Sequence, residues 1–104
     1  MYNYTVNIEL VAFEWDSLKE KKNRQKHGVS FEEARSVFYD LHALLIHDPD
    51  HSEEEERFIL MGYSAEQRLL VVCHCFRSED RIIRLISARK ATPTERDQYA
   101  ENYL

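Results

Sequence analysis

The 104-residue chain has little glycine, proline or cysteine, with two residues of each. So few Gly and Pro leave little room for long irregular loops or for a linker between domains. Cys73 and Cys75 are too few for a disulfide framework and suggest a reducing compartment such as the cytoplasm. No stretch approaches the roughly 20 apolar residues that span a membrane, and the N-terminus "MYNYTVNIEL" does not resemble a signal peptide. These absences predict one cytoplasmic domain over residues 1–104.

Positive charge is also in deficit, because 14 Lys and Arg face 19 Asp and Glu and give a net charge of −5. An acidic chain opposes non-specific binding to nucleic acid. The charge is unevenly distributed, however. Residues 19–27 carry five basic side chains and one Glu, and residues 77–96 carry six basic side chains and three acidic ones. Local fields in these two segments can therefore still favour an anion.

Capping signals predict a first helix in "DSLKEKKNRQKHG". Asp16 is one N-cap candidate, and a capping box of Ser17 and Glu20 is the other. Gly28 is the expected C-terminal stop. Leu18 is almost the whole apolar content of this helix, so packing alone would barely hold it.

Two further helices show the same signals more clearly. Ser30 and Glu33 form a capping box at the start of "SFEEARSVFYD". Thr92 and Glu95 form another at the start of "TPTERDQYAENYL", where Pro93 takes the first helical position.

The remaining segments have the alternation of strands. A first strand is expected at about Thr5 to Trp15, and four more are expected in "HALLIHD", "RFILMGYS", "LLVVCHCFR" and "RIIRLISARK". The last four follow one another through short connections, which predicts an antiparallel meander. The expected fold is an α+β domain, in which a twisted antiparallel sheet of five strands carries two N-terminal helices and one C-terminal helix.

Two segments contain residue types that bind metals but lack the spacing of known metal sites. In "CHC", alternation along a strand turns His74 away from Cys73 and Cys75, and no second thiol pair follows at zinc-finger spacing. "HDPDHSEEEER" is rich in carboxylates but lacks the glycine and the ligand spacing of an EF-hand loop. We therefore expect buried cysteines and a solvated acidic loop, with Glu56 and Arg57 at the entrance of the next strand.

The last hairpin raises a harder question, because it carries four guanidiniums, at Arg77, Arg81, Arg84 and Arg89. Strict alternation in the second strand gives two mixed faces. One holds Ile83, Leu85, Ser87 and Arg89, and the other holds Arg84, Ile86, Ala88 and Lys90. We expect one or two of the arginines to pair with Glu14, Asp40 or the glutamate run. Several arginines converging on one sheet also suit a phosphate, which guanidinium binds at two points.

The basic segment "KKNRQKHG" is either a solvated helix face or part of a site. Lys26 and His27 lie in its last turn, beside Gly28. Histidine exchanges its proton near neutral pH, as general acid–base chemistry requires.

Several segments form a recognisable series: "FEWD", "KHGVSFEEA", "DPDHSEEEERF" leading into "MGYS", "LLVVCH" and "IRLISARKATPTERDQY". In these segments, which run in family order from Phe13 to Tyr99, the chain resembles the BrnT family of toxins from bacterial type II toxin–antitoxin pairs. Residues 1–12 precede the usual family start and are expected to be an N-terminal extension or added strand.

The resemblance implies a fold related to RelE-like ribonuclease toxins and the cleavage of RNA, with growth arrest as the result. It implies no metal and no cofactor, because the ribose 2′-OH attacks the adjacent phosphate. It also implies neutralisation by a BrnA-like ribbon-helix-helix antitoxin, which forms a heteromer with the toxin. The toxin would contact operator DNA only through this antitoxin.

Carried onto this sequence, the resemblance suggests roles for seven residues. Arg77 and Arg89 would clamp the phosphate, and His27 and Glu56 would transfer protons. The expected RNA-binding residues are Lys26, Arg84 and Lys90. His74 is a weaker candidate, because a mid-strand position favours the core. The alternative function is a catalytically inactive module that binds the antitoxin and tunes repression of the operon, which the acidic net charge would suit.

Overall fold

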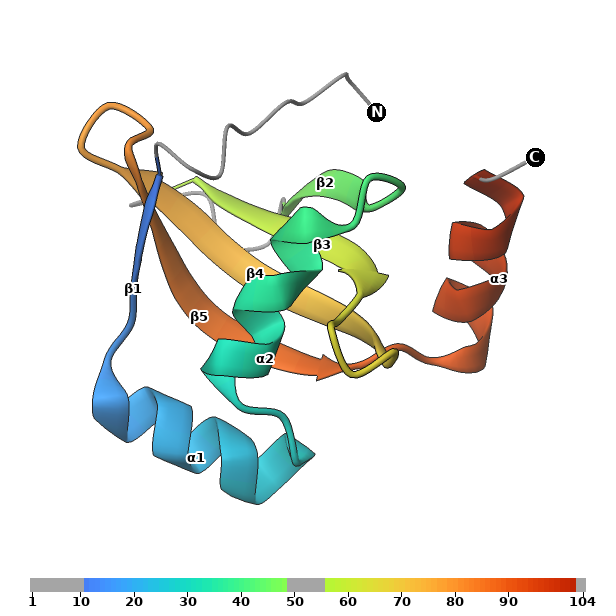
Figure 1. Ribbon diagram of the computed structural model, residues 1–104, viewed down its shortest axis with the longest axis horizontal. Coiled ribbons are helices and arrows are strands. Elements are labelled where there is room, and N and C mark those ends of the chain that lie inside the picture. The colour runs from blue at the N-terminus through green and yellow to red at the C-terminus, as the bar shows by residue number, and fades with distance from the viewer. Residues whose placement is uncertain (1–10, 49–55, 103–104) are drawn as a thin grey trace.

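The computed structural model describes residues 11–48 and 56–102. Its helices are α1 (Ser17–His27), α2 (Phe31–Ser36), the 3₁₀ helix η2 (Val37–Tyr39) and α3 (Pro93–Asn102). Its strands are β1 (Ala12–Glu14), β2 (Leu44–Asp48), β3 (Arg57–Tyr63), β4 (Leu69–Arg77) and β5 (Ile82–Lys90). Figure 1 shows α2 lying across the sheet with α1 beside it, while α3 stands apart from both. The predicted α+β class and the order of its elements are confirmed.

The five strands form one sheet in the order β1-β5-β4-β3-β2. Strands β2 to β5 pair antiparallel in succession, which confirms the meander. β1 pairs with β5 in the parallel sense, however, with Ala12 opposite Ile82. The sheet is therefore mixed rather than wholly antiparallel. The first strand was expected from Thr5 onwards, and residues 1–10 lie outside the described residues, so the N-terminal extension stays a prediction.

The parallel direction of β1 follows from what α1 does next. α1 begins directly after β1 and continues along the same outer edge of β5 (Figure 1). There the Asn23 side chain takes the place of a neighbouring strand. Its Nδ2 donates to the Ala88 carbonyl at 2.8 Å, and its Oδ1 accepts from the Ala88 amide at 3.1 Å. Leu18, the main apolar residue of α1, is 60% exposed and packs little. The hydrogen bonds of Asn23 therefore hold α1 against β5.

The helix ends follow the predicted caps. Asp16 is the N-cap of α1, and its carboxylate accepts from the amides of Leu18 and Lys19 at 2.8 and 3.0 Å. Gly28 ends the helix with a φ of 68°, a left-handed conformation that glycine adopts without steric cost. Ser30 caps α2 by accepting from the Glu33 amide at 3.0 Å.

The apolar side chains form two clusters, one on each face of the sheet. The larger lies under α1 and α2 and contains Val29, Phe31, Ala34, Val37, Phe38, Leu45, Leu60, Leu70, Val72, Ile83, Leu85 and Ala88. The smaller lies on the opposite face under α3 and contains Leu44, Met61, Leu69, Val71 and Tyr99. Since α3 covers only one end of that face, the middle of the sheet is open there.

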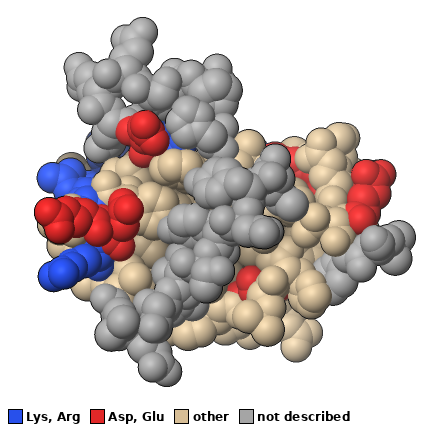
Figure 2. Space-filling view, turned by 90° about the horizontal axis from the view of Figure 1, so that it is seen from above, with Lys and Arg blue, Asp and Glu red and all other residues tan. Residues whose placement is uncertain are grey.

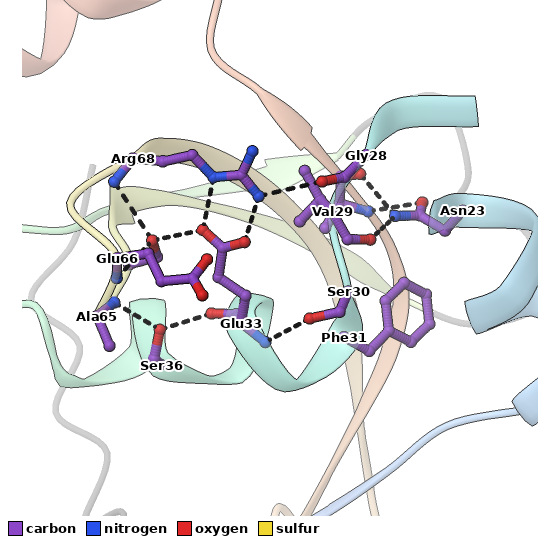
Figure 3. A network of polar contacts seen from close by, with 12 residues as sticks. Asn23, Gly28, Val29, Ser30, Phe31, Glu33, Ser36, Ala65, Glu66 and Arg68 are labelled. Atoms are coloured by element: carbon purple, nitrogen blue, oxygen red, sulfur yellow. Dashed lines mark hydrogen bonds and ion pairs between the residues drawn. The ribbon is translucent and has the colours of Figure 1, made fainter. Parts of the chain in front are cut away.

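A polar network joins the helical layer to the sheet (Figure 3). The Glu33 side chain on α2 is buried, and it accepts from Arg68 Nε at 2.9 Å, from Arg68 Nη2, and from Ser64 Oγ at 2.7 Å. Arg68 Nη2 also donates to the Gly28 carbonyl at 3.1 Å. The Arg68 guanidinium lowers the pKa of Glu33 to about 2. This ion pair thus connects α2, the turn after α1 and the turn between β3 and β4.

Glu33→Gln is expected to lower the free energy of unfolding by about 2 kcal/mol near pH 7, because Arg68 loses its charged partner. A carboxyl with a lowered pKa stabilises the fold above its unfolded pKa, and that contribution disappears as the pH falls towards the folded value. Wild type should therefore lose stability between about pH 5 and pH 2, and the variant should lose less. Urea unfolding across this range measures both effects.

Glu32→Gln is the matched control, since the neighbouring Glu32 side chain is 72% exposed. Equal stability of the two variants at neutral pH would contradict a structural role for the Glu33–Arg68 pair.

Candidate functional site

A β-bulge in β5 decides which side chains reach the open face of the sheet. Cys73 pairs with Ser87, but the next residue of β4, His74, pairs with Leu85, so Ile86 is an extra residue. The expectation that Ser87 and Arg89 share a face with Ile83 and Leu85 is therefore wrong. The bulge shifts the alternation by one residue, and Ser87 and Arg89 point away from the core.

The open face contains a depression of about 300 Å³ beside the end that α3 covers. Its lining consists of Arg57 and Ile59 from β3, Val71 and Cys73 from β4, and Ile86, Ser87 and Arg89 from β5. Two arginines from separate strands thus contribute to the lining of one depression, whose other lining residues are uncharged. This depression is our candidate site.

Arg89 is held at the edge of the depression by α3. Its Nη1 donates to Glu95 Oε1 at 2.7 Å, and its Nη2 donates to Glu95 Oε2 at 2.9 Å. The ion pair lowers the pKa of Glu95 to about 2 and raises that of Arg89. An acidic partner for one of the hairpin arginines was expected, but Glu95 was not among the partners suggested.

The partner of Arg84 was anticipated. Arg84 Nη1 donates to Glu14 Oε2 at 2.5 Å, across the parallel pairing of β5 with β1. Arg84 faces away from the core, like Arg89, but it does not line the depression. Arg77 lies further along the sheet, because it pairs with Ile82 at the far end of β4 and is exposed.

Three predicted residues lie elsewhere. Lys26 and His27 end α1, which runs along the outer edge of β5 (Figure 1). Lys90 is the last residue of β5 and is exposed. The structure therefore brings Arg89 into the depression, while Lys26, His27, Lys90, Arg77 and Arg84 do not line it. Their roles in RNA binding and catalysis stay predictions.

Arg57 is the site residue that sequence reasoning did not place. It was noted only at a strand entrance, next to Glu56, which is exposed and directly precedes β3. Alternation along β3 could have found it, since Arg57, Ile59 and Met61 share the face that also carries Arg89. The rest of the acidic loop lies outside the described residues.

His74 is a core residue, as expected for its mid-strand position. Its side chain is fully buried among Phe38, Phe58 and Phe76, with ring centroids 4.9 to 6.2 Å away. Nδ1 lies 3.3 Å from the Val72 carbonyl, while Nε2 has no hydrogen-bond partner in the described structure. Burial lowers the pKa of His74 to about 4. The imidazole is therefore neutral at physiological pH.

The two cysteines lie on the face of the sheet opposite His74. Cys73 lines the depression, whereas Cys75 is buried. Within residues 11–48 and 56–102, no three His, Cys, Asp or Glu side chains are grouped so as to hold a metal ion. No helix in these ranges is long and apolar enough to cross a membrane.

Charge on the face seen in Figure 2 is mixed rather than broadly basic. Lys and Arg gather at the left-hand end of this view, close beside Asp and Glu. The exposed turn between β4 and β5, which carries Glu79, Asp80 and Arg81, projects at that end in Figure 1. The right-hand end, where α3 lies in Figure 1, shows acidic side chains. Attraction of an anion therefore depends on local sites such as the Arg57–Arg89 depression.

Comparison with known proteins identifies the family. A family model described as ribonuclease toxin, BrnT, of type II toxin–antitoxin system matches residues 15–95. The chain belongs to the BrnT family. It is thus a member of a family of ribonuclease toxins, and its partner is an antitoxin. A search among curated proteins gave no match.

The fold also matches a solved BrnT structure. The crystal structure of the ribonuclease toxin BrnT from Brucella abortus superposes with a TM-score of 0.60 and 20% sequence identity. The match covers 79% of this chain and 97% of that one. At this identity the likeness supports the fold alone.

The BrnT-like segment "KHGVSFEEA" is largely structural in this chain. Gly28 ends α1, Val29 and Phe31 are completely buried, and Ser30 caps α2. Glu33 anchors the network shown in Figure 3. Lys26, His27 and Glu32 are the side chains of this segment that have no such structural role.

His74→Phe should remove a source of acid lability. A buried neutral His stabilises the fold above its unfolded pKa of about 6.5, and this contribution is lost as the pH falls towards about 4. Thermal unfolding of wild type should therefore weaken over this window, and the variant should show a flatter profile.

His42→Gln provides the control, because His42 is exposed. Identical pH profiles for wild type and His74→Phe would show that His74 is not buried in its neutral form.

Proposed function

We propose that this BrnT-family chain is a metal-independent endoribonuclease. The ribose 2′-OH attacks the adjacent phosphate, and Arg57 and Arg89 stabilise the charge that develops on it. The observation that carries the proposal is the depression on the open sheet face, which both arginines line together with uncharged residues. Guanidinium binds phosphate oxygens at two points and cannot lose its proton at physiological pH.

Strand geometry places the two arginines at opposite ends of the depression. Arg57 pairs with Cys75 and Arg89 pairs with Val71, so their positions differ by four residues along β4. Four residues correspond to about 13 Å of strand. A phosphate bound in the depression would have one of these two positively charged residues on either side of it. Such preorganised charge stabilises the phosphorane-like transition state.

Glu56 and His27 are the proposed proton-transfer residues. Glu56 is exposed and directly precedes Arg57, which lines the depression. His27 lies in the last turn of α1, along the edge of β5. An RNA strand that crosses this edge would meet Lys26 and Lys90, which are exposed. Arg77 and Arg84 extend the basic positions of the same open face.

Neutralisation is proposed to come from a BrnA-like ribbon-helix-helix antitoxin. The family match supports an antitoxin partner. An antitoxin that covers the open face would block the depression, and the acidic residues of α3 offer a surface for a basic partner.

A non-catalytic module that binds the antitoxin is the second candidate. Two of the hairpin arginines already have carboxylate partners, Arg84 with Glu14 and Arg89 with Glu95. Because these carboxylates neutralise the two guanidinium charges, the arginines could serve the structure of the fold without binding RNA. Expression without the antitoxin separates the two functions, because only the enzyme should arrest growth.

Incubation of the purified chain with RNA in excess EDTA tests the enzyme directly. We expect cleavage that leaves 2′,3′-cyclic phosphate ends, and a rate at least about 100-fold lower for Arg89→Ala or Arg57→Ala, because each removes a phosphate-stabilising cation. Arg81→Ala is the matched control, since Arg81 is exposed in the turn of the same hairpin.

Unchanged cleavage by Arg89→Ala would contradict the clamp. Intact RNA with every variant, together with normal growth on expression, would favour the antitoxin-binding module.

A further inference from the structure

The contact between Glu95 and Arg89 occupies the position where a phosphate would bind. Both carboxylate oxygens accept from the two terminal guanidinium nitrogens, at 2.7 and 2.9 Å. Carboxylate and phosphate use the same two-point geometry towards arginine. A phosphate that approaches Arg89 therefore meets a carboxylate already at the guanidinium.

Glu95 is also fixed by its own helix. Its Oε1 accepts from the Thr92 amide at 2.9 Å, while its amide donates to Thr92 Oγ1 at 3.2 Å. This capping box begins α3 and restrains the side chain. The pKa of about 2 keeps the carboxylate ionised at physiological pH. Glu95 is thus a permanent negative charge with a fixed position at the rim of the depression.

Within the described ranges, the lining beside the two arginines consists of Ile59, Val71, Cys73, Ile86 and Ser87, all uncharged. Glu95 therefore reduces the positive charge available to a ligand by one unit. Its repulsion of a bound ligand scales with the negative charge that the ligand brings.

We propose that Glu95 is a specificity-determining residue, which admits the singly charged phosphodiester inside an RNA chain and disfavours the doubly charged phosphomonoester at a chain end. The inference rests on the proposed function, since it concerns the same phosphate position at Arg89. Discrimination by an added repulsive charge is a general means of specificity. It would favour phosphodiesters inside a chain over chain ends that carry a phosphomonoester.

Glu95→Gln isolates the charge. Glutamine serves at the third position of a capping box, so the start of α3 is retained while the negative charge is removed. Two probes are titrated into each variant. One is a 2′-O-methyl uridylyl-adenosine dinucleotide, with one phosphodiester and no attacking hydroxyl. The other is uridine 3′-monophosphate at about pH 8, where a phosphomonoester is doubly charged because its second pKa is about 6.

We expect Glu95→Gln to bind the monophosphate about tenfold tighter and the dinucleotide about threefold tighter than wild type does. The ratio of the two dissociation constants, measured by calorimetry or NMR titration, is the decisive quantity. A general loss of structure would not shift it in this direction. Glu101→Gln is the matched control, because it removes an exposed charge from the last turn of the same helix and should leave the ratio unchanged.

An unchanged ratio in Glu95→Gln overturns the proposal, whether both affinities rise or fall together. A parallel fall would make Glu95 a positioning residue for the Arg89 guanidinium. The proposed function fails separately: if Arg89→Ala binds the dinucleotide and cleaves RNA as wild type does, the phosphate position itself is wrong. Loss of RNA cleavage in Arg89→Ala with an unchanged ratio in Glu95→Gln overturns the specificity role alone.

Discussion

The rest of the structure depends on one buried ion pair, between Glu33 of α2 and Arg68 of the turn between β3 and β4. The apolar core can press the helices against the sheet, but burial is non-directional and does not choose their position along it. The ion pair fixes this position, because Arg68 also donates to the Gly28 carbonyl and Glu33 also accepts from Ser64 Oγ. The end of α1, and His27 with it, takes its place from these contacts.

A single extra residue, Ile86, gives the sheet its two chemically different faces. Before the bulge, Ile83 and Leu85 point into the core, and after it Ala88 does. Arg89 is turned outwards as a result. Without the bulge, Arg89 would enter the apolar layer beneath α2, where an unpaired guanidinium costs several kcal/mol. The bulge therefore reconciles a well-packed core with a charged open face on the same strand.

The limits of sequence reasoning follow from how far apart the determining residues lie. The caps at Asp16 and Ser30 were predictable, because a cap is formed by residues within one turn. The meander was predictable from alternation and short connections. The outward direction of Arg89 was not, because the bulge is a property of two paired strands. Arg57 was noted only at a strand entrance, and the pairing of Arg89 with Glu95 depends on the outward direction that the bulge gives to Arg89.

The contact of Asn23 with Ala88 has a consequence for association between molecules. β1 covers β5 only as far as Arg84, so the later part of β5 would otherwise present free amides and carbonyls at the sheet edge. Such an edge is a template for strand addition by another chain and a starting point for aggregation. One asparagine side chain satisfies the Ala88 amide and carbonyl together, and the polar helix behind it keeps a neighbouring strand away. The weakly packed helix α1 thereby protects the β5 edge against aggregation.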